Sequence, residues 1–359
     1  MSAGPLPEQR SLRIVFVVPR FHTNLYFATR ALIEAGHIVH LVCRDRAEAE
    51  DHSRVSPHYL SATASFGEIW ALLRRLDPDL LVIRDIPGLT RKFLMAGMAQ
   101  RRRLYAYDQH PVSRHRSLRK FISDMLRGRP LRRITPIPGL QQPTQPARLS
   151  HYLPFPVAQA GGQNETSAGD GKQIRILCVG KLAQPRKNHQ LLLQALAELP
   201  AEFAWRLTLA GATETSVSGG SDGYLDALRR QASDGPLADR LTILENVPFR
   251  DMAELYATHD ICVLPSVDEP LGTSPLEAMA YGCVPVISDG CGSAGYIPSE
   301  EYGFVVRGGD VESLRLALAK LLASPARLGA MSAKVRELAA TEFSEATFVR
   351  RVEVLAARR

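Results

Sequence analysis

Cysteine, aromatic residues and long apolar runs are scarce in this chain of 359 residues. Its five cysteines form no Cys-x-x-Cys pair, and Phe, Trp and Tyr together make up 7% of the residues. An odd number of cysteines on strand-like segments is typical of a reducing compartment rather than of a disulfide framework. No run of about 18 apolar residues occurs, and the first residues hold no apolar core of a secretory signal. We therefore expect a cytoplasmic protein without a membrane-spanning helix.

The sequence lacks the motifs of several enzyme classes. There is no Gly-x4-Gly-Lys-Ser/Thr loop and no nucleophile elbow, which weighs against P-loop NTPases and serine hydrolases. No cluster of His and Cys has the spacing of a zinc site. Asp77-Pro-Asp79 has the Asp-x-Asp pattern of metal-dependent enzymes, but it directly precedes an apolar strand, where turn chemistry explains it. We expect no metal ion in the site.

What the chain does contain is an alternation of apolar strands and amphipathic helices. Hydrophobic residues make up 45% and charged residues 23%, as in globular proteins. The segment 12–18 is almost entirely apolar and β-branched, which indicates a parallel strand buried on both faces. The alternation predicts βαβ units and a doubly wound α/β sheet. In the first half the expected strands are 12–18, 37–43, 80–84 and 104–107, and the expected helices are 24–35, 66–76 and 88–102.

A small, polar, glycine-rich stretch at 157–173 then interrupts the pattern and indicates a linker. The alternation restarts with strands at 174–179, 205–210, 241–244, 261–264 and 284–287 and helices at 188–199, 311–322, 328–340 and 344–357. We therefore predict a Rossmann-like domain at 1–158, a linker at 159–173, a second Rossmann-like domain at 174–341 and a final helix at 342–359 that packs back across the cleft. Ligands of such sheets bind at the carboxyl ends of the strands, so we expect a cleft between the domains.

The segment 268–282 (DEPLGTSPLEAMAYG) carries the strongest chemical signal. Ser274, Pro275 and Glu277 have the spacing of a helix start with a capping box, and Gly282 is a typical stop. Glu277 therefore has a purely structural interpretation as a cap. The second interpretation is functional, because backbone N–H groups at a helix start bind phosphate.

The wider pattern favours the functional interpretation. Glu269 and Glu277 together resemble the Glu-x7-Glu signature of the family 4 glycosyltransferases, which are retaining enzymes of the GT-B fold that use nucleotide sugars. The segment 178–189 (CVGKLAQPRKNH) is similar to the strand, glycine and basic pair of that family. The segments 251–266 and 288–308 resemble its approach to the motif and its glycine-rich loop. The resemblance extends over most of the second half.

The resemblance implies residue roles. Lys181 and Lys187 match the pair that holds the donor diphosphate, where fixed cations stabilise the charge of the leaving group. Glu277 matches the acceptor of the ribose hydroxyls, and Glu269 matches a residue that contacts the transferred sugar. His110 resembles the cleft histidine near the reacting centre. Backbone amides for sugar and phosphate are expected from Gly272, Thr273 and Ser274.

The first domain matches the family less closely. Its first loop, residues 19–25, lacks the adjacent glycines that the family usually carries there. His22, Thr23 and Asn24 remain as polar candidates on the acceptor side. Two non-functional interpretations stay open at this point. A lone histidine can be an ordinary polar loop residue, and a lone lysine can be a solvated surface cation.

The positive charge is concentrated in one segment. The formal net charge is +7, yet residues 84–133 alone hold 14 Lys and Arg against three Asp. Within them, 114–129 has an apolar stripe edged by cations, which is typical of a basic amphipathic helix. Two interpretations stay open: a helix that packs on the core, and an anionic membrane surface bound through 114–133 on the cytoplasmic side.

The resemblance implies a retaining glycosyltransferase that moves a sugar from a UDP- or GDP-sugar to a glycan or lipid-linked acceptor, in polysaccharide, lipopolysaccharide or glycolipid biosynthesis. It implies no essential cofactor or metal. Alternatives are a non-catalytic nucleotide-sugar-binding scaffold and a GT-B epimerase or phosphorylase. A nucleic-acid-binding protein is disfavoured, because the basic segment lacks interleaved aromatic residues and any recognisable nucleic-acid module.

Overall fold

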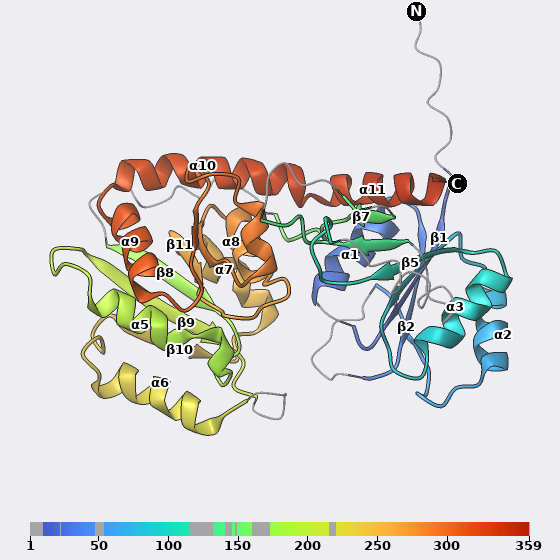
Figure 1. The fold of residues 1–359 in the computed structure, drawn as a ribbon, viewed down its shortest axis with the longest axis horizontal. Helices are drawn as coiled ribbons and strands as arrows, with labels where there is room; N and C mark the ends of the chain where they lie inside the picture. Colours follow the sequence, from blue (N-terminus) through green and yellow to red (C-terminus); the bar gives the residue numbers. More distant parts are fainter. Residues whose placement is uncertain are drawn as a thin grey trace, which may run out of the picture.

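Two parallel β-sheets, each flanked by helices, form the framework of the protein (Figure 1). The structure is a computed structural model. It describes residues 10–21, 23–46, 54–114, 132–140, 146–147, 149–159, 173–214 and 220–358. Within these residues no helix combines the length and the apolar character needed to cross a bilayer.

The first sheet has seven strands in the order β3-β2-β1-β4-β5-β6-β7. Its strands are β1 (Arg13–Val18), β2 (Ile38–Cys43), β3 (His58–Tyr59), β4 (Leu80–Arg84), β5 (Arg103–Tyr107), β6 (Arg133–Thr135) and β7 (Ser150–Tyr152), and its helices are α1 (Thr23–Glu34), α2 (Phe66–Leu76) and α3 (Thr90–Ala99). The four long strands and three helices expected from the sequence are confirmed. The short strands β3, β6 and β7 were not foreseen, because two or three mixed residues show no strand periodicity.

The second sheet has six strands in the order β10-β9-β8-β11-β12-β13. Its strands are β8 (Ile174–Val179), β9 (Trp205–Gly211), β10 (Leu241–Glu245), β11 (Ile261–Leu264), β12 (Val284–Ser288) and β13 (Phe304–Val306). The helices are α5 (His189–Ala197), α6 (Asp222–Asp234), α7 (Met252–Ala257), α8 (Ser274–Ala280), α9 (Val311–Leu322), α10 (Pro325–Glu342) and α11 (Glu345–Ala357). The five strands and four helices expected here are confirmed, with ends that differ by a few residues.

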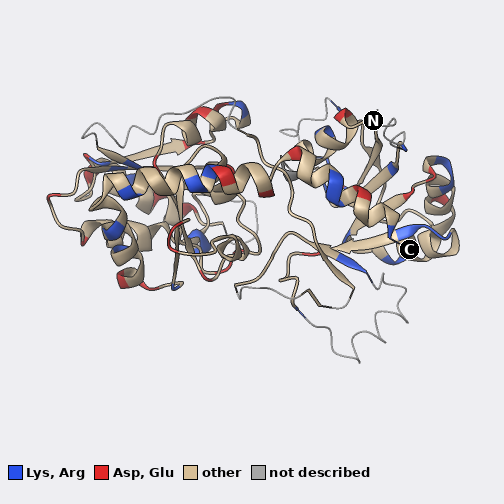
Figure 2. Ribbon diagram, turned by 90° about the horizontal axis from the view of Figure 1, so that it is seen from above, with Lys and Arg blue, Asp and Glu red and all other residues tan. Residues whose placement is uncertain are grey.

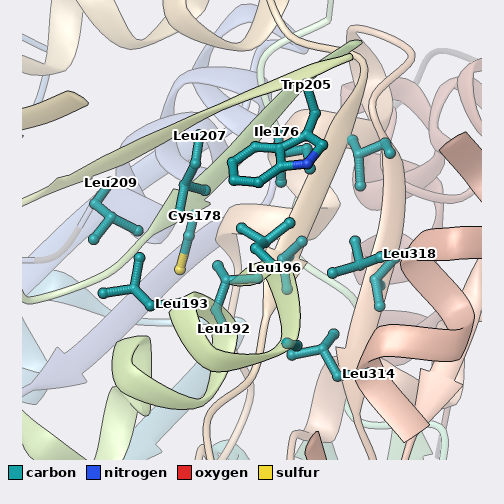
Figure 3. Close-up of a cluster of buried hydrophobic side chains, with 14 of the residues drawn as sticks. Ile176, Cys178, Leu192, Leu193, Leu196, Trp205, Leu207, Leu209, Leu314 and Leu318 are labelled. Carbon is teal, nitrogen blue, oxygen red and sulfur yellow. The ribbon is translucent and has the colours of Figure 1, made fainter. Parts of the chain in front are cut away.

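Alternate residues of each buried strand cover opposite faces of the second sheet. In β8, Ile176 and Cys178 face α5 and α9, whereas Leu177 belongs to the cluster on the opposite face. The α5–α9 side is closed by leucines of both helices, packed around the buried ring of Trp205 (Figure 3). Burial on both faces explains why these strands read as continuous apolar runs instead of alternating ones.

The last two helices lie end to end along one side of both domains (Figure 1). Charged residues of both signs are spread along them (Figure 2). α10 packs against α8 of the second domain, and α11 packs against α1 of the first. Phe348 and Val352 are 1% exposed and lie in the core of the first domain, where Phe348 stacks on Phe155 at 5.6 Å between ring centroids.

Polar contacts also fix α11 to the first domain. Arg30 of α1 forms an ion pair with Glu345, and Glu353 lies 3.1 Å from the ring of the buried His37. Tyr105 of β5 donates a hydrogen bond to the carbonyl of Leu355 at 3.1 Å. The final helix is therefore part of the first domain's core, although it follows the second domain in sequence.

We predict that Phe348→Ala destabilises the protein by about 3–5 kcal/mol, because it removes a fully buried ring and leaves a cavity. Chemical denaturation followed by circular dichroism measures the change. Val354→Ala on the same helix is the matched control, since Val354 is 47% exposed and should change stability by less than about 0.5 kcal/mol. Equal effects of the two substitutions would contradict this packing of α11.

Candidate active site

The crevice of the second domain opens where its strand order reverses, between β8 and β11. From β8 the chain proceeds through β9 to β10 on one side, and from β11 through β12 to β13 on the other. The loops that leave the carboxyl ends of β8 and β11 therefore diverge, which is where ligands of open α/β sheets bind. Lys181 follows β8 and Glu269 follows β11, so the fold brings both expected site residues to this point.

Two glycines allow the loop after β8 to pass close to its neighbours. A Cβ atom at Gly211 would lie 1.7 Å from the carbonyl oxygen of Gly180, and a Cβ at Gly180 would lie 3.2 Å from Cδ of Lys187. The chain then turns through the 3-10 helix η2 (Pro185–Lys187) and Asn188, which has a φ of +59°. This tight path lays the side chain of Lys187 back over the end of β8.

Glu269 connects the two diverging loops. Its carboxylate accepts hydrogen bonds from Nζ of Lys187 and from Nη1 of Arg186, the latter at 2.7 Å. Lys187 and Glu269 are only 11% and 14% exposed. A largely buried ion pair is tolerated where both charges have partners, so this triad holds the crevice in one geometry.

Lys181 is more loosely held. Its ammonium group is 3.9 Å from the carboxylate of Glu214, and its side chain is 29% exposed. Partial burial lowers the pKa of Lys181 from its usual value, and the attraction of Glu214 opposes this shift. Lys181 is therefore a cation that an incoming anion can readily bind.

The segment that enters α8 differs from the capping box expected from the sequence. The N-cap is Thr273, which makes no side-chain cap bond, and Ser274 is already the first helical residue. The Ser274 hydroxyl instead donates a hydrogen bond to the carbonyl of Val179 at 3.1 Å. Gly272 has a φ of +75° and lies so close to Leu264 that a Cβ would clash at 2.5 Å. The predicted cap at Ser274 was wrong, because the helix begins one residue earlier than expected, with Thr273 as the N-cap.

The carboxylate of Glu277 is likewise free of the predicted capping role. It accepts a hydrogen bond of 2.6 Å from the hydroxyl of Tyr256 and one from the side chain of Thr273. Burial raises the pKa of the Glu277 carboxyl, and both hydrogen bonds oppose that shift. The predicted stop at Gly282 is confirmed: its φ is +90°, and Cys283 donates to the carbonyl of Ala278 at 3.1 Å, as in a Schellman motif.

A cavity of about 560 Å³ lies between the domains and contains these groups. Its second-domain lining includes every donor-side residue expected from the sequence, namely Lys181, Lys187, Glu269, Gly272, Thr273, Ser274 and Glu277. The other lining residues of that domain are Val179, Gly180, Val247, Phe249, Met252 and Tyr256. From the first domain come mostly apolar side chains: Phe16, Val18, Leu25, Val82, Arg84, Tyr107, Gln109 and Phe155. The size suits a ligand of a few hundred daltons.

The structure does not bring His110 to this cavity. Its side chain is 52% exposed and lies 3.6 Å from the carboxylate of Asp108, whereas the neighbouring Gln109 does line the cavity. His22 and the side chains of Thr23 and Asn24 lie outside the described residues. So do 115–131, which hold most of the expected basic amphipathic helix, and 160–172, which hold most of the expected linker.

Sequence reasoning missed Arg84, Tyr107, Gln109 and Tyr256 at the cavity, and it missed Arg186, which binds the cavity-lining Glu269. Arg186 adjoins the recognised Lys187, and Tyr256 lies in the segment 251–266 that was already singled out, so proximity to a motif was a usable signal for both. Arg84 was counted only as one member of a charge run. No three His, Cys, Asp or Glu residues gather as metal ligands within the described parts of the chain. Asp79 of the Asp77-Pro-Asp79 pattern lies at the amino end of β1, where its carboxylate accepts a hydrogen bond from the backbone N–H of Arg13 at 2.8 Å. The cavity lies at the other end of the sheet.

Comparison with known proteins shows what the chain is similar to. Residues 163–338, slightly less than half of the chain, match the family model of the group 1 glycosyl transferases. The GDP-mannose-dependent alpha-(1-6)-phosphatidylinositol monomannoside mannosyltransferase of Mycolicibacterium smegmatis is 30% identical over 248 residues, which cover 67% of this chain and 62% of that protein. The chain thus spans less than two thirds of the length of the curated relatives that it matches first.

Solved structures resemble the whole chain at low identity. A glycosyltransferase from Rickettsia africae is 14% identical with a TM-score of 0.75, and the match covers 97% of this chain and 98% of that one. The Anabaena protein HepE in complex with UDP is 15% identical with a TM-score of 0.73, over 97% and 100% of the two chains. These likenesses establish the GT-B fold, with two Rossmann-like domains that face a cleft. The segment 163–338, which holds most of the second domain, is similar to the group 1 glycosyl transferases.

Proposed function

We propose that this protein is a retaining glycosyltransferase that moves a sugar from a nucleotide sugar to an acceptor hydroxyl. One observation carries the proposal: the 560 Å³ cavity joins two lysines and two carboxylates on its second-domain wall. A nucleotide sugar offers the matching chemistry, since its diphosphate is anionic and its ribose and hexose present hydroxyl donors. The residue roles below rest on this match and on the family resemblance.

On the donor side, Lys181 and Lys187 bind the diphosphate. The leaving nucleoside diphosphate gains negative charge as the glycosidic bond breaks, and fixed cations in a partly dry cleft stabilise that charge. Glu277 accepts hydrogen bonds from the ribose hydroxyls, for which a carboxylate is suited as a group that only accepts. Glu269, held by Lys187 and Arg186, contacts the hydroxyls of the transferred sugar.

The transferred glycosyl passes through an oxocarbenium-like state. Neither carboxylate is assigned as a covalent nucleophile, because Glu269 is engaged by two cations and Glu277 by the Tyr256 hydroxyl. The acceptor hydroxyl attacks from the face that the diphosphate leaves, and an oxygen of the departing diphosphate takes its proton. This arrangement retains the configuration at the anomeric carbon.

The acceptor binds at the wall of the first domain, which is the part of the cavity that the donor leaves open. A glycan or lipid-linked acceptor is in keeping with the related mycobacterial mannosyltransferase, whose name includes phosphatidylinositol monomannoside. That relative uses GDP-mannose, and the structural neighbour HepE holds UDP. Both nucleotides are therefore candidates for the donor.

A thermal-shift screen of UDP-, GDP-, ADP- and dTDP-sugars, followed by a hydrolysis assay of each hit, tests the proposal. One donor is expected to raise the melting temperature and to be slowly hydrolysed. A donor that binds and is neither hydrolysed nor transferred indicates a scaffold, and a donor whose sugar is converted to its epimer indicates an epimerase. If no nucleotide sugar binds, the proposal is wrong.

We predict that Lys187→Ala lowers kcat by roughly 10- to 1000-fold, because the leaving diphosphate loses about 1.5–4 kcal/mol of stabilisation. Single-turnover kinetics with the donor found in the screen measure the loss. Lys320→Ala is the control: Lys320 lies on α9 and pairs with Glu300 at the surface, so its replacement should leave kcat unchanged. Turnover near the wild-type value in the Lys187 variant would remove this residue from the site.

We predict that donor affinity falls on acidification and that Glu277→Gln abolishes this fall. Burial raises the pKa of Glu277, so its carboxylate gains a proton as the pH falls toward that pKa and loses part of its capacity to accept ribose hydroxyls. The variant should also raise the donor KM roughly 10-fold at neutral pH. Initial rates across the range from pH 5 to 8 measure both effects.

Melting curves of the Glu277 variant show whether it stays folded over the same range. Glu254→Gln on the neighbouring helix α7 is a matched control, since Glu254 lies outside the cavity lining. A pH profile that is the same in wild type and in the Glu277 variant would show that another group titrates.

We predict that EDTA leaves turnover unchanged, because the proposed mechanism assigns the diphosphate charge to lysines. Turnover is measured before and after dialysis against EDTA, with and without added Mg²⁺ or Mn²⁺. A loss that added metal restores would show that a divalent ion shares the diphosphate.

A further inference from the structure

The first sheet has its own point of strand reversal, and Arg84 lies there. In the order β3-β2-β1-β4-β5-β6-β7 the chain proceeds outward in opposite directions from β1 and from β4. β1 and β4 are paired from Ile14 and Leu80 onward, and Arg84 is the last residue of β4. The carboxyl ends of these two strands thus form the crevice of the first domain, and Arg84 lines the shared cavity from that side.

Arg84 is the only charged side chain among the described residues with which the first domain lines the cavity. The side chains around it on this wall are apolar and nearly inaccessible: Phe16 is 1% exposed, Val82 is 4% and Val18 is 5%. Arg84 itself is half-buried. Cations on an apolar wall are normally paired, yet Arg84 forms no ion pair with any carboxylate in the described part of the chain.

Within the residues that the structure describes, the guanidinium of Arg84 contacts an aromatic face. Cζ of Arg84 lies 5.8 Å from the centre of the Tyr107 ring, and that ring packs edge-on against Phe155 at 5.4 Å. A cation over an aromatic face is held in position while its N–H donors stay free. Burial raises the pKa of Tyr107 to about 12, so the phenol stays neutral and does not compensate the charge of Arg84.

The guanidinium of Arg84 is therefore held in place by Tyr107, has no carboxylate partner among the described residues, and lines a cavity with an apolar wall. Its planar fork of donors matches the geometry of phosphate and carboxylate oxygens. On the opposite wall, Lys181 and Lys187 already supply cations for the donor diphosphate. Arg84, a third cation on the acceptor wall, is therefore suited to bind a second anionic group.

We infer that Arg84 binds an oxyanion of the acceptor, a phosphate or a carboxylate, beside an apolar portion that contacts Phe16, Val18 and Val82. This inference rests on the proposed function, since it assigns the first-domain wall to the acceptor. It selects phosphorylated or acidic acceptors over neutral glycans. The anion belongs either to a soluble molecule or to a lipid headgroup, which share this chemistry.

Titration calorimetry of the full chain with phenyl phosphate and with benzoate tests the free-anion source, and benzyl alcohol is the neutral comparison. Each ligand is titrated with and without the nucleoside diphosphate of the donor found in the screen, which occupies the lysines. Arg84→Gln should weaken binding of phenyl phosphate or benzoate about 10- to 100-fold, and Arg84→Lys should recover part of the loss. Arg91→Gln removes the same charge from the exposed face of α3, outside the cavity lining, and should change nothing.

Flotation with phosphatidylcholine vesicles, with or without phosphatidylglycerol, tests the lipid source with the same variants. Arg84-dependent binding in either arm supports the inference, and the arm in which it appears identifies the source. Equal binding by wild type and Arg84→Gln in both arms overturns it. So does a loss of nucleoside diphosphate affinity in Arg84→Gln, because Arg84 would then belong to the donor site.

Nucleotide binding by the wild type separates the two proposals. If no nucleotide sugar binds and phenyl phosphate binding still depends on Arg84, the anion site stands and the transferase assignment fails. If the donor is bound and hydrolysed while Arg84→Gln binds every ligand like the wild type, only the anion site fails. Circular dichroism and melting curves of all three variants exclude unfolding as the cause of lost binding.

Discussion

The contact of Glu269 with Lys187 and Arg186 is the constraint on which the candidate site depends. The three residues belong to loops that leave β8 and β11 in diverging directions, and the ion pairs join these loops again beyond the sheet. A backbone bond of 3.1 Å from Val267 to the carbonyl of Arg186 reinforces the junction. Because the charges are mostly buried and mutually satisfied, the crevice is preformed and needs little ordering when a ligand arrives.

The two walls of the cavity differ in a way that follows from their sheets. The second-domain wall presents charges and hydroxyls from the loops after β8 and β11 and from the start of α8, beside apolar side chains such as Val247, Phe249 and Met252. The first-domain wall is built largely from the strand ends of β1, β4 and β5, so it presents apolar side chains around one cation. A donor rich in phosphate and hydroxyl groups matches the former wall. The latter suits a ligand with less polar surface, in keeping with the proposed division of the cavity between a donor and an acceptor.

The local sequence pattern predicted most of the helices and strands. Features that depend on contacts between residues distant in sequence were not predicted. Strand β4 was predicted to the residue, because an apolar run between turn signals leaves little choice. The partners of Glu269 were not predictable, since Lys187 is 82 positions away in sequence and meets it only through the strand order. The cap at Ser274 was also not predictable, since the helix begins one residue earlier and the Ser274 hydroxyl donates to Val179 on a distant strand. Arg84 was overlooked because its significance arises from neighbours on β1 and β5, which a charge count does not register.

The position of α11 bears on the order in which the protein is made. Phe348, Val349, Val352 and Leu355 fill the core of the first domain, yet they leave the ribosome only after the whole second domain has been synthesised. The second sheet and its helices through α10 are synthesised before α11. Until α11 is synthesised, the first domain exposes an apolar groove along α1 and β5. The domain that is synthesised first is thus completed after the second one.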